Sequence, residues 1–207
     1  MNRDPAGTTP EETAPAGEAA EAAEAAEEAA LIARIAGGEP NRYGALVDRY
    51  QRRLWWSCLR LLGDPDEADE VVQEAFVRAW ERLGEFDPAH RFYPWLFTIA
   101  RNRCLNTLRR RRTWGFLSLS RDEPPPLAAL DAAETRAESG ELGHALEDCL
   151  ATLPADQGEA FDLRHGEGFA YAEIARVLDV PRGTVMSRLH RAREKMRECL
   201  KSKGWRP

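Results

Sequence analysis

Apolar residues recur at helical spacing over most of this chain, and no segment shows the two-residue alternation of a half-buried strand. The first helical run spans residues 31–112. Turn-forming residues interrupt it at residues 37–38, 63–65 and 87–88. A second run begins at residue 142. We therefore predict an all-α fold, with a bundle of three or four amphipathic helices followed by a second, smaller helical unit.

The most specific pattern lies at residues 170–196, where a short helix, a turn and a longer helix are predicted in succession. The longer helix opens after Pro181, and its apolar stripe is Val185, Leu189, Ala192 and Met196. Its opposite face carries the cationic and hydrogen-bonding residues Arg182, Thr184, Ser187, Arg188, His190, Arg191 and Lys195. One apolar and one cationic face suit the major groove of DNA, which favours a helix-turn-helix over an ordinary solvated helix.

The net charge of −6 conceals two basic patches. Residues 1–30 carry eight acidic residues against Arg3, so the rest of the chain nets +1. Residues 101–112 contain six arginines and no acid, and residues 181–206 contain nine Lys or Arg against two acids. Residues 122–148 between them are acidic. Two separate cationic patches are typical of a protein that contacts nucleic acid at two places.

The four cysteines, Cys58, Cys104, Cys149 and Cys199, lie 45 to 50 residues apart in helical apolar patterns. This spacing suggests neither a zinc site nor a disulfide framework, so we expect four small buried side chains, no metal and no cofactor. The sequence has no apolar run long enough to span a membrane and no secretory signal, which predicts a cytoplasmic protein.

These patterns divide the chain into five parts. We expect a disordered acidic Ala/Glu tail at residues 1–28, because it has no large apolar residue after Met1 to pack. The other parts are a helical bundle at 29–112, a flexible acidic linker containing prolines at 113–141, the helix-turn-helix unit at 142–201 and a tail at 202–207.

Three segments in order resemble the extracytoplasmic-function group of bacterial RNA polymerase sigma factors. DEADEVVQEAFVRAWERL (66–83) is similar to the polymerase-binding helix of the family's region 2. FDPAHRFYPWLFTIARNRCLNTLRRRR (86–112) is similar to the segment that recognises and melts the promoter −10 element. LPADQGEAFDLRHGEGFAYAEIARVLDVPRGTVMSRLHRARE (153–194) is similar to region 4, which reads the −35 element. One helix-turn-helix is a weak signal, whereas this ordered triple is strong.

The resemblance implies roles for particular residues. It implies −35 contacts by the seven polar residues of the last helix named above, and it implies polymerase contacts by Asp69, Gln73 and Glu74. It implies −10 contacts by Asp87, His90, Arg91, Phe92, Tyr93, Arg101, Asn102, Arg103, Asn106, Arg109 and Arg110. The chemistry agrees, because aromatic rings replace base stacking, arginine binds phosphate and asparagine pairs with adenine. Trp95 and Phe97 are expected to be core residues instead.

Three positions depart from the family's pattern. Met186 stands where many relatives carry a basic or polar residue, and Asn106 stands where an Asp is common. Ala170 stands where Ser or Thr often caps the helix, which forfeits about 1 kcal/mol. Each departure limits what can be forecast about the promoter sequence.

The resemblance implies an alternative sigma factor, which is not an enzyme. Its implied partners are promoter DNA, the coiled coil of the largest subunit and the flap region of core RNA polymerase, and an anti-sigma factor. The sequence lacks a nucleophile triad, a metalloprotease motif and a glycine-rich phosphate loop. Two alternatives are a conventional helix-turn-helix regulator, which leaves residues 66–112 without a role, and a helical antagonist of sigma factors, which leaves both basic patches unexplained.

Overall fold

The structure is a computed structural model that describes residues 15–115 and 141–205, with side chains described for residues 23–111 and 141–205. Within these residues every regular element is a helix, as predicted. The N-terminal bundle consists of α1 (Pro15–Ala36), η1 (Pro40–Arg42), α2 (Tyr43–Leu62), α3 (Pro65–Glu81), η2 (Leu83–Glu85) and α4 (Phe92–Gly115). The C-terminal bundle consists of α6 (Glu141–Ala151), α7 (Ala155–His165), α8 (Tyr171–Leu178) and α9 (Arg182–Ser202). Most of the expected linker lies outside the described residues.

The turn between α2 and α3 shows how local chemistry sets the helix ends. Gly63 adopts a left-handed conformation with φ of 71° and donates its N–H to the Leu59 carbonyl, which closes α2. Asp64 then caps α3, because its Oδ1 accepts the Glu67 N–H at 3.0 Å. Pro65 occupies the first turn, where its missing N–H costs nothing. The breaks predicted at residues 37–38, 63–65 and 87–88 are all confirmed.

The N-terminal helix corrects the expectation of a disordered tail through residue 28. Helix α1 begins at Pro15, and Glu28 on its second half is only 7% exposed. The Ala/Glu composition favours helix, and Ile32 and Ile35 pack the end of α1 into the core. The expectation failed because it required an apolar residue for packing, whereas Glu28 is held by hydrogen bonds. Residues 1–14 lie outside the described residues.

The cysteines correct a second expectation. Cys149 on α6 and Cys199 on α9 form a disulfide with a Cα–Cα distance of 5.7 Å. Their separation of 50 residues gave no local signal, because the pairing depends on α6 lying against α9. Cys58 and Cys104 remain free thiols buried between α2 and α4, as expected. A hydrogen bond with the Cys104 sulfur and burial both raise the pKa of Cys58.

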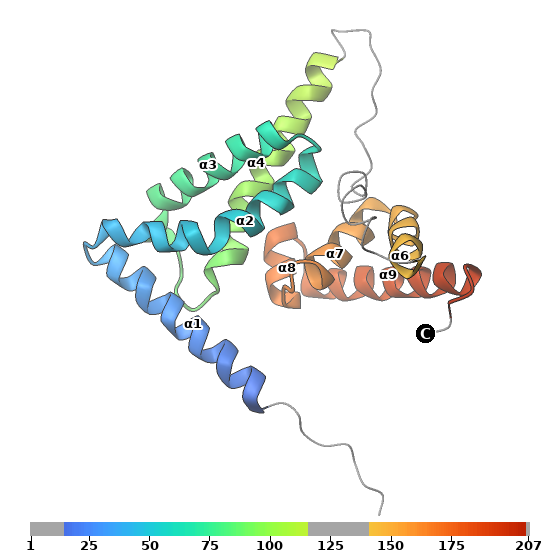
Figure 1. Ribbon diagram of the computed structural model, residues 1–207, viewed down its shortest axis with the longest axis horizontal. Coiled ribbons are helices and arrows are strands. Elements are labelled where there is room, and N and C mark those ends of the chain that lie inside the picture. The colour runs from blue at the N-terminus through green and yellow to red at the C-terminus, as the bar shows by residue number, and fades with distance from the viewer. Residues whose placement is uncertain (1–14, 116–140, 206–207) are drawn as a thin grey trace, which may run out of the picture.

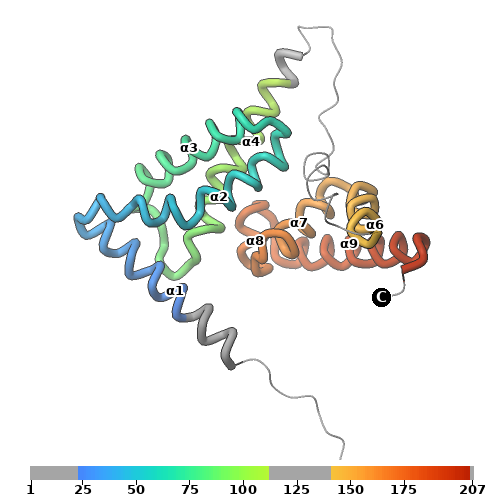
Figure 2. The backbone as a smooth tube through the Cα atoms, in the orientation of Figure 1, coloured from blue at the N-terminus to red at the C-terminus, as the bar shows by residue number. Residues whose placement is uncertain are grey.

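The two bundles lie against each other over α4 and α8. Figure 1 shows α8 at the end of the C-terminal bundle nearest α4, while α9 extends away from the N-terminal bundle. The tube in Figure 2 shows the same arrangement, in which α6, α7 and α8 all lie along α9. A single cluster of buried apolar side chains runs from Ile32 on α1 to Leu189 on α9. Phe169, in the turn before α8, is fully buried within this cluster.

No helix in the described part of the chain combines the length and the apolar character that crossing a membrane requires.

Candidate nucleic-acid interface

Helix α9 has the two faces that the sequence predicted. Val185, Leu189 and Ala192 are fully buried and Met196 is 5% exposed, so the apolar stripe packs inward. The predicted −35 residues Arg182, His190, Arg191 and Lys195 are exposed, and Thr184, Ser187 and Arg188 are partly exposed. Met186 lies among them with 53% of its surface exposed. All seven predicted residues therefore lie outside the buried stripe of α9 and reach solvent at least in part.

Two of these side chains already have partners within the chain. The Ser187 hydroxyl donates to the Thr184 carbonyl at 2.9 Å. Arg188 Nε lies 3.2 Å from Asp156 Oδ2 at the start of α7. Among the described residues, none pairs with Arg182, Arg191 or Lys195. The surface of α9 thus presents unpaired positive charge, which suits phosphate or a base edge.

Helix α8 packs against α9 and lacks the side-chain cap that a Ser or Thr would supply. Ala170 is its N-cap residue, with φ of −70° and ψ of 155°, and an alanine side chain has no acceptor. The Glu173 carboxylate replaces half of the capping box by accepting the Ala170 N–H at 2.7 Å. Glu173 is therefore 6% exposed although it is charged.

The second predicted surface contains a hollow of about 560 Å³ beside α4. It lies between the end of α3, the loop at residues 86–91, α4 and α8. Its lining includes the predicted residues Asp87, His90, Arg91, Asn102, Arg103 and Asn106. It also includes Arg78, Arg82, Trp95 and Arg176, which sequence reasoning did not assign to DNA. A concave surface with five arginines and one indole ring can hold a phosphate chain and a stacked base.

The loop before α4 is shaped by Asp87. Its Oδ1 accepts the Ala89 N–H at 2.9 Å, and its carbonyl accepts the His90 N–H at 3.0 Å. These bonds form a tight turn that leaves Asp87, His90 and Arg91 exposed. The three predicted loop residues therefore remain accessible at the edge of the hollow.

Two aromatic residues predicted to contact the −10 element are buried instead. Phe92 is fully buried and its ring lies 5.6 Å from that of Phe86. Tyr93 is 1% exposed, and burial raises the pKa of its hydroxyl, which remains a neutral donor. Both are in the first turn of α4, which faces the core, so neither can stack on a base in this conformation. Trp95, expected to be core, is only partly buried and lines the hollow.

The residues on the basic face of α4 differ in how far they are exposed and in whether a carboxylate of the same chain binds them. Arg109 and Arg110 are exposed, as are Asn102 and Asn106. Arg101 instead binds Glu159 of α7, with an N–O distance of 2.5 Å. Arg103 binds Glu74 of α3, which was predicted to contact polymerase. Two predicted −10 residues are thus held by carboxylates of the same chain.

The predicted polymerase surface on α3 keeps two of its three residues free to bind a partner. Asp69 and Gln73 are exposed, whereas Glu74 is engaged by Arg103. The same helix exposes 57% of Val77 and 41% of Trp80, which sequence reasoning did not select. The Tyr43 ring lies 5.0 Å from that of Trp80 and steadies its position. Exposed apolar side chains bordered by acids are typical of a protein-binding surface.

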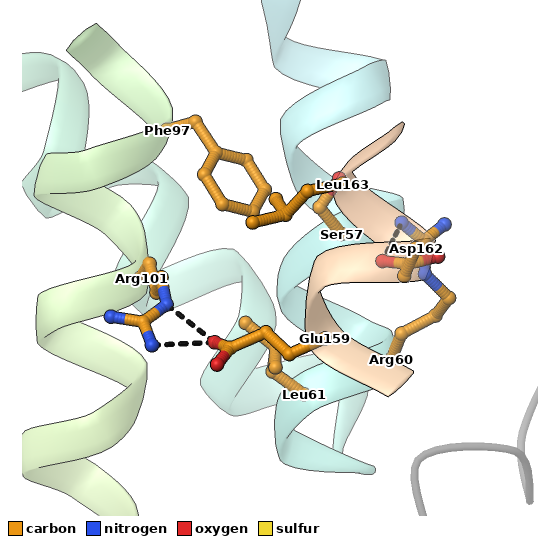
Figure 3. Close-up of a pocket in the computed structure, with 8 residues that line it drawn as sticks. All are labelled: Ser57, Arg60, Leu61, Phe97, Arg101, Glu159, Asp162 and Leu163. Carbon is orange, nitrogen blue, oxygen red and sulfur yellow. Dashed lines mark hydrogen bonds and ion pairs between the residues drawn. The ribbon is translucent and has the colours of Figure 1, made fainter. Parts of the chain in front are cut away.

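Sequence reasoning also missed a junction between the bundles. Phe97, Leu163 and Ser57 line a gap of only about 20 Å³. Figure 3 shows these side chains together, with the pairs Arg101–Glu159 and Arg60–Asp162 beside them. Arg60 Nη2 lies 3.5 Å from Asp162 Oδ2. These residues come from α2, α4 and α7, so the C-terminal bundle lies directly on the face of α4 that carries predicted −10 residues. A signal was present in the alternation of basic and acidic segments, but it did not identify partners.

Two models of known protein families match this chain, one in each bundle. The sigma-70 region 2 model matches residues 46–113, and the sigma-70 region 4 model matches residues 143–196. The RNA polymerase sigma-H factor of Pseudomonas aeruginosa is 33% identical over 82% of this chain and 92% of its own length. The extracytoplasmic-function RNA polymerase sigma-E factor of Haemophilus influenzae is 36% identical over 80% of this chain and 90% of its own length.

Solved structures agree with these matches. The sigma factor RpoE of Bartonella quintana, in complex with the anti-sigma factor NepR, superposes with a TM-score of 0.62 at 28% identity. It covers 77% of this chain and 96% of that one. CnrH, in complex with the cytosolic domain of CnrY, gives a TM-score of 0.59 at 27% identity, covering 84% and 97% of the two chains.

Proposed function

This chain belongs to the extracytoplasmic-function group of RNA polymerase sigma factors, and we propose which of its residues carry promoter recognition. As a sigma factor, it directs core RNA polymerase to specific promoters for transcription initiation. We assign −35 recognition to α9, −10 recognition to the hollow beside α4, and polymerase binding to α3. The observation that carries the proposal is the division of α9 into a fully buried apolar stripe and an exposed cationic face.

At the −35 element, α9 lies in the major groove. Arg191 and Arg182 are exposed and can donate to guanine or phosphate, while Thr184 and Ser187 reach base edges. Met186, 53% exposed among them, offers an apolar contact to a thymine methyl group. Arg188 exchanges Asp156 for DNA on binding, because the ion pair is partly exposed and weak.

At the −10 element, the wall of the hollow that belongs to the N-terminal bundle receives the opened strand. Trp95 supplies the aromatic face, and the exposed loop residues Asp87, His90 and Arg91 border a displaced base. Asn102 and Asn106 face the same hollow with amides suited to an adenine edge. Arg109 and Arg110 extend the cationic surface along α4 toward the neighbouring phosphates.

Two surfaces are proposed for polymerase. Asp69 and Gln73, with the exposed Val77 and Trp80 on α3, bind the coiled coil of the largest subunit. On α6, which contacts α9 through Ala145 and Cys149, three leucines remain 36–43% exposed. This stripe, Leu142, Leu146 and Leu150, suits an apolar helix of the flap region.

The other partners and the setting follow from the same reasoning. The two similar sigma factor structures are complexes, one with an anti-sigma factor, which supports an anti-sigma partner for this chain too. We place the protein in the cell interior, where core polymerase works. The chain supplies recognition and strand capture, and the polymerase supplies the chemistry of RNA synthesis.

The test is run-off transcription from a pool of genomic fragments, with core polymerase in the presence and absence of the purified chain. We expect discrete start sites that depend on the chain, with −35 and −10 elements at fixed spacing. Arg191→Ala should strongly reduce these products, while Arg34→Ala, an exposed arginine of α1, serves as the matched control and should leave them unchanged. Binding to DNA alone without new starts would instead support a conventional regulator.

A further inference from the structure

A buried carboxylate from the C-terminal bundle lies in a cluster of donors from the N-terminal bundle. Glu167, between α7 and α8, is only 3% exposed. Its Oε1 lies 2.6 Å from Arg60 Nη2, and its Oε2 lies 3.3 Å from Arg53 Nε and 3.0 Å from the Tyr93 hydroxyl. The Ser57 hydroxyl also donates to Glu167. A charge this buried is stable only with such partners, so the contact requires both bundles in place.

A buried aromatic ring, that of Phe169, lies near this carboxylate, and we call it the aromatic plug. Phe169, two residues further on, is fully buried, with its ring 5.7 Å from that of Tyr93 and 5.4 Å from that of Phe97. Both partner rings belong to α4. Separation of the bundles would expose this ring to water, so apolar burial and ion pairing favour the same closed arrangement.

The contacts around the plug engage the residues assigned to the −10 element. Arg101 binds Glu159, and Arg91 Nη1 lies 3.4 Å from Glu173 Oε2. Figure 3 shows Arg101 and Glu159 facing each other across the junction. The side chain of Arg101 is left 15% exposed. Acidic side chains of the C-terminal bundle thus occupy positions on α4 and its loop where DNA phosphates would bind.

We propose that the C-terminal bundle covers part of the −10 face in the free protein, and that Glu167 and Phe169 hold it in this position. We call this pair of contacts the lock. This inference rests on the proposed function, because it concerns regulation of the same −10 surface. The −35 face of α9 stays exposed in the closed state. Core polymerase binds the two bundles at separate places and so shifts the population toward an open state. In that state the −10 face no longer contacts the C-terminal bundle. The apparent affinity for polymerase is reduced by the fraction of closed molecules.

The closed state is tested by energy transfer between dyes on Glu81→Cys of α3 and Lys201→Cys of α9, both exposed positions. The native cysteines are buried or disulfide-bonded, so only the new thiols react. The chain without polymerase should show high transfer. Glu167→Arg and Arg60→Glu, each placing like charges together, should both lower it. Transfer in the unmodified chain equal to that of these variants would overturn the lock.

Two controls separate opening from misfolding. The double variant Arg60→Glu with Glu167→Arg re-forms an oppositely charged pair and should regain much of the lost transfer, which an unfolded bundle would not. Glu39→Arg disrupts a carboxylate that also binds two arginines, Arg34 and Arg42, but lies away from the junction, and it should change nothing. Failure of the double variant to regain transfer would contradict the assigned pairing.

The effect of opening on transcription is measured by run-off transcription at a fixed concentration of core polymerase. The concentration of chain giving half-maximal product should fall about fivefold for Glu167→Arg, the size typical of coupling between sites. Opening without any such fall would overturn the regulatory role. Failure of the proposed function is a different result, because the unmodified chain would then start no transcripts whatever the energy transfer shows.

A separate observation concerns Glu28 of α1. Its Oε1 accepts the Phe92 N–H at 2.9 Å, and its Oε2 accepts the Tyr50 hydroxyl. Phe92 is the first residue of α4 and directly follows the exposed loop that carries Asp87 and His90. The first N–H groups of a helix have no partner within the helix, and a carboxylate there is favourable. Burial of Glu28 to 7% exposure keeps water from replacing this bond.

We infer that Glu28 is a positioning residue, which fixes the start of α4 and therefore the geometry of the −10 loop. Glu28 does not face the hollow, so its effect is transmitted through Phe92. This gives α1 a role in reading the −10 element that its composition does not suggest.

The test compares Glu28→Ala with Glu27→Ala, a matched change at the exposed neighbouring position. Transcription from a series of promoters with single −10 substitutions should discriminate about fivefold less between bases for Glu28→Ala, a loss within the range of one good base contact. Half-maximal polymerase concentration should not change. Glu28→Gln keeps an acceptor for the Phe92 N–H and should regain most of the discrimination. An unaltered base profile, or an equal loss of polymerase affinity, would overturn the inference.

Discussion

The two surfaces proposed to bind DNA differ in how many of their charged side chains are already paired within the chain. On α9, Arg182, Arg191 and Lys195 are exposed and have no partner among the described residues. On α4, Arg101 and Arg103 are bound by Glu159 and Glu74. Both surfaces are cationic in the sequence, but ion pairs within the chain hold more of the predicted arginines on α4 than on α9, where only Arg188 is paired among the described residues. We therefore expect α9 to bind DNA in the free chain, and α4 to bind it fully only after its ion pairs with the C-terminal bundle are broken.

The largest expected difference between the bundles is in their response to reductant. Closing a loop of 50 residues with Cys149–Cys199 stabilises the C-terminal bundle by about 4 kcal/mol in the chain-entropy model. Hydrogen exchange with and without dithiothreitol should show faster exchange in α6 and α9. The N-terminal bundle, whose Cys58 and Cys104 are free thiols, should not change.

The double variant Cys149→Ser with Cys199→Ser provides the control for that experiment. It should resemble the reduced protein and become insensitive to reductant. Equally faster hydrogen exchange in both bundles on reduction would contradict this prediction, because it would mean that the bundles unfold as one unit.

A smaller effect is expected for Arg191→Ala on the open surface. Loss of one good contact to a base or phosphate should weaken binding to a −35 duplex by about 1–3 kcal/mol. Fluorescence anisotropy of a labelled duplex measures this directly. Arg197→Ala, also an exposed arginine of α9 but paired with Glu194, is the matched control and should cost less. Equal losses for the two variants would show that only total charge matters.

A stabilising change of about 1 kcal/mol is expected for Ala170→Ser. Residue 170 already has the extended N-cap conformation, and a serine hydroxyl could accept the free N–H that alanine leaves unpaired. Thermal unfolding should show a higher midpoint for the variant. Ala170→Gly, which lacks the hydroxyl, should not produce the increase, and a rise with glycine would contradict the capping explanation.

The smallest effect is a pH dependence confined to the C-terminal bundle. Burial, and then the charges of Arg193 and Arg164, lower the pKa of His165 in the folded state. The unfolded chain then binds the proton more readily, so stability is present above about pH 6.5 and is lost as pH falls below it. Thermal unfolding is measured at about pH 7.5 and about pH 5.5, one unit on either side of the unfolded pKa of histidine. The unfolding midpoint should fall more between these two pH values for the unmodified chain than for His165→Gln. An identical fall would remove His165 from the explanation.

Local patterns predicted the elements well because helix signals are short-range. The breaks at Gly63 and Pro65 and the apolar stripe of α9 depend on residues within one or two turns, and all are confirmed. The sigma family and its two regions were also predicted, because ordered motifs carry that information. Whether each assigned residue contacts DNA or polymerase stays a prediction.

The errors share a physical origin in contacts between distant residues. Phe92 and Tyr93 are aromatic residues beside a loop, but only tertiary packing shows that their turn of α4 faces the core. Cys149 meets Cys199, and Glu28 meets Phe92, across 50 and 64 residues of sequence. Glu167 reaches Arg53 from 114 residues away. No periodicity encodes such pairings.

Footprinting of one promoter fragment, first by the free chain and then by the chain with core polymerase, measures directly which of the two surfaces binds DNA in each state. The free chain should protect the −35 element alone, because α9 is exposed whereas acidic side chains of the C-terminal bundle bind Arg91 and Arg101 at the −10 surface. Polymerase should add protection and strand opening at the −10 element. Protection of both elements by the free chain, with no change on adding polymerase, would contradict it.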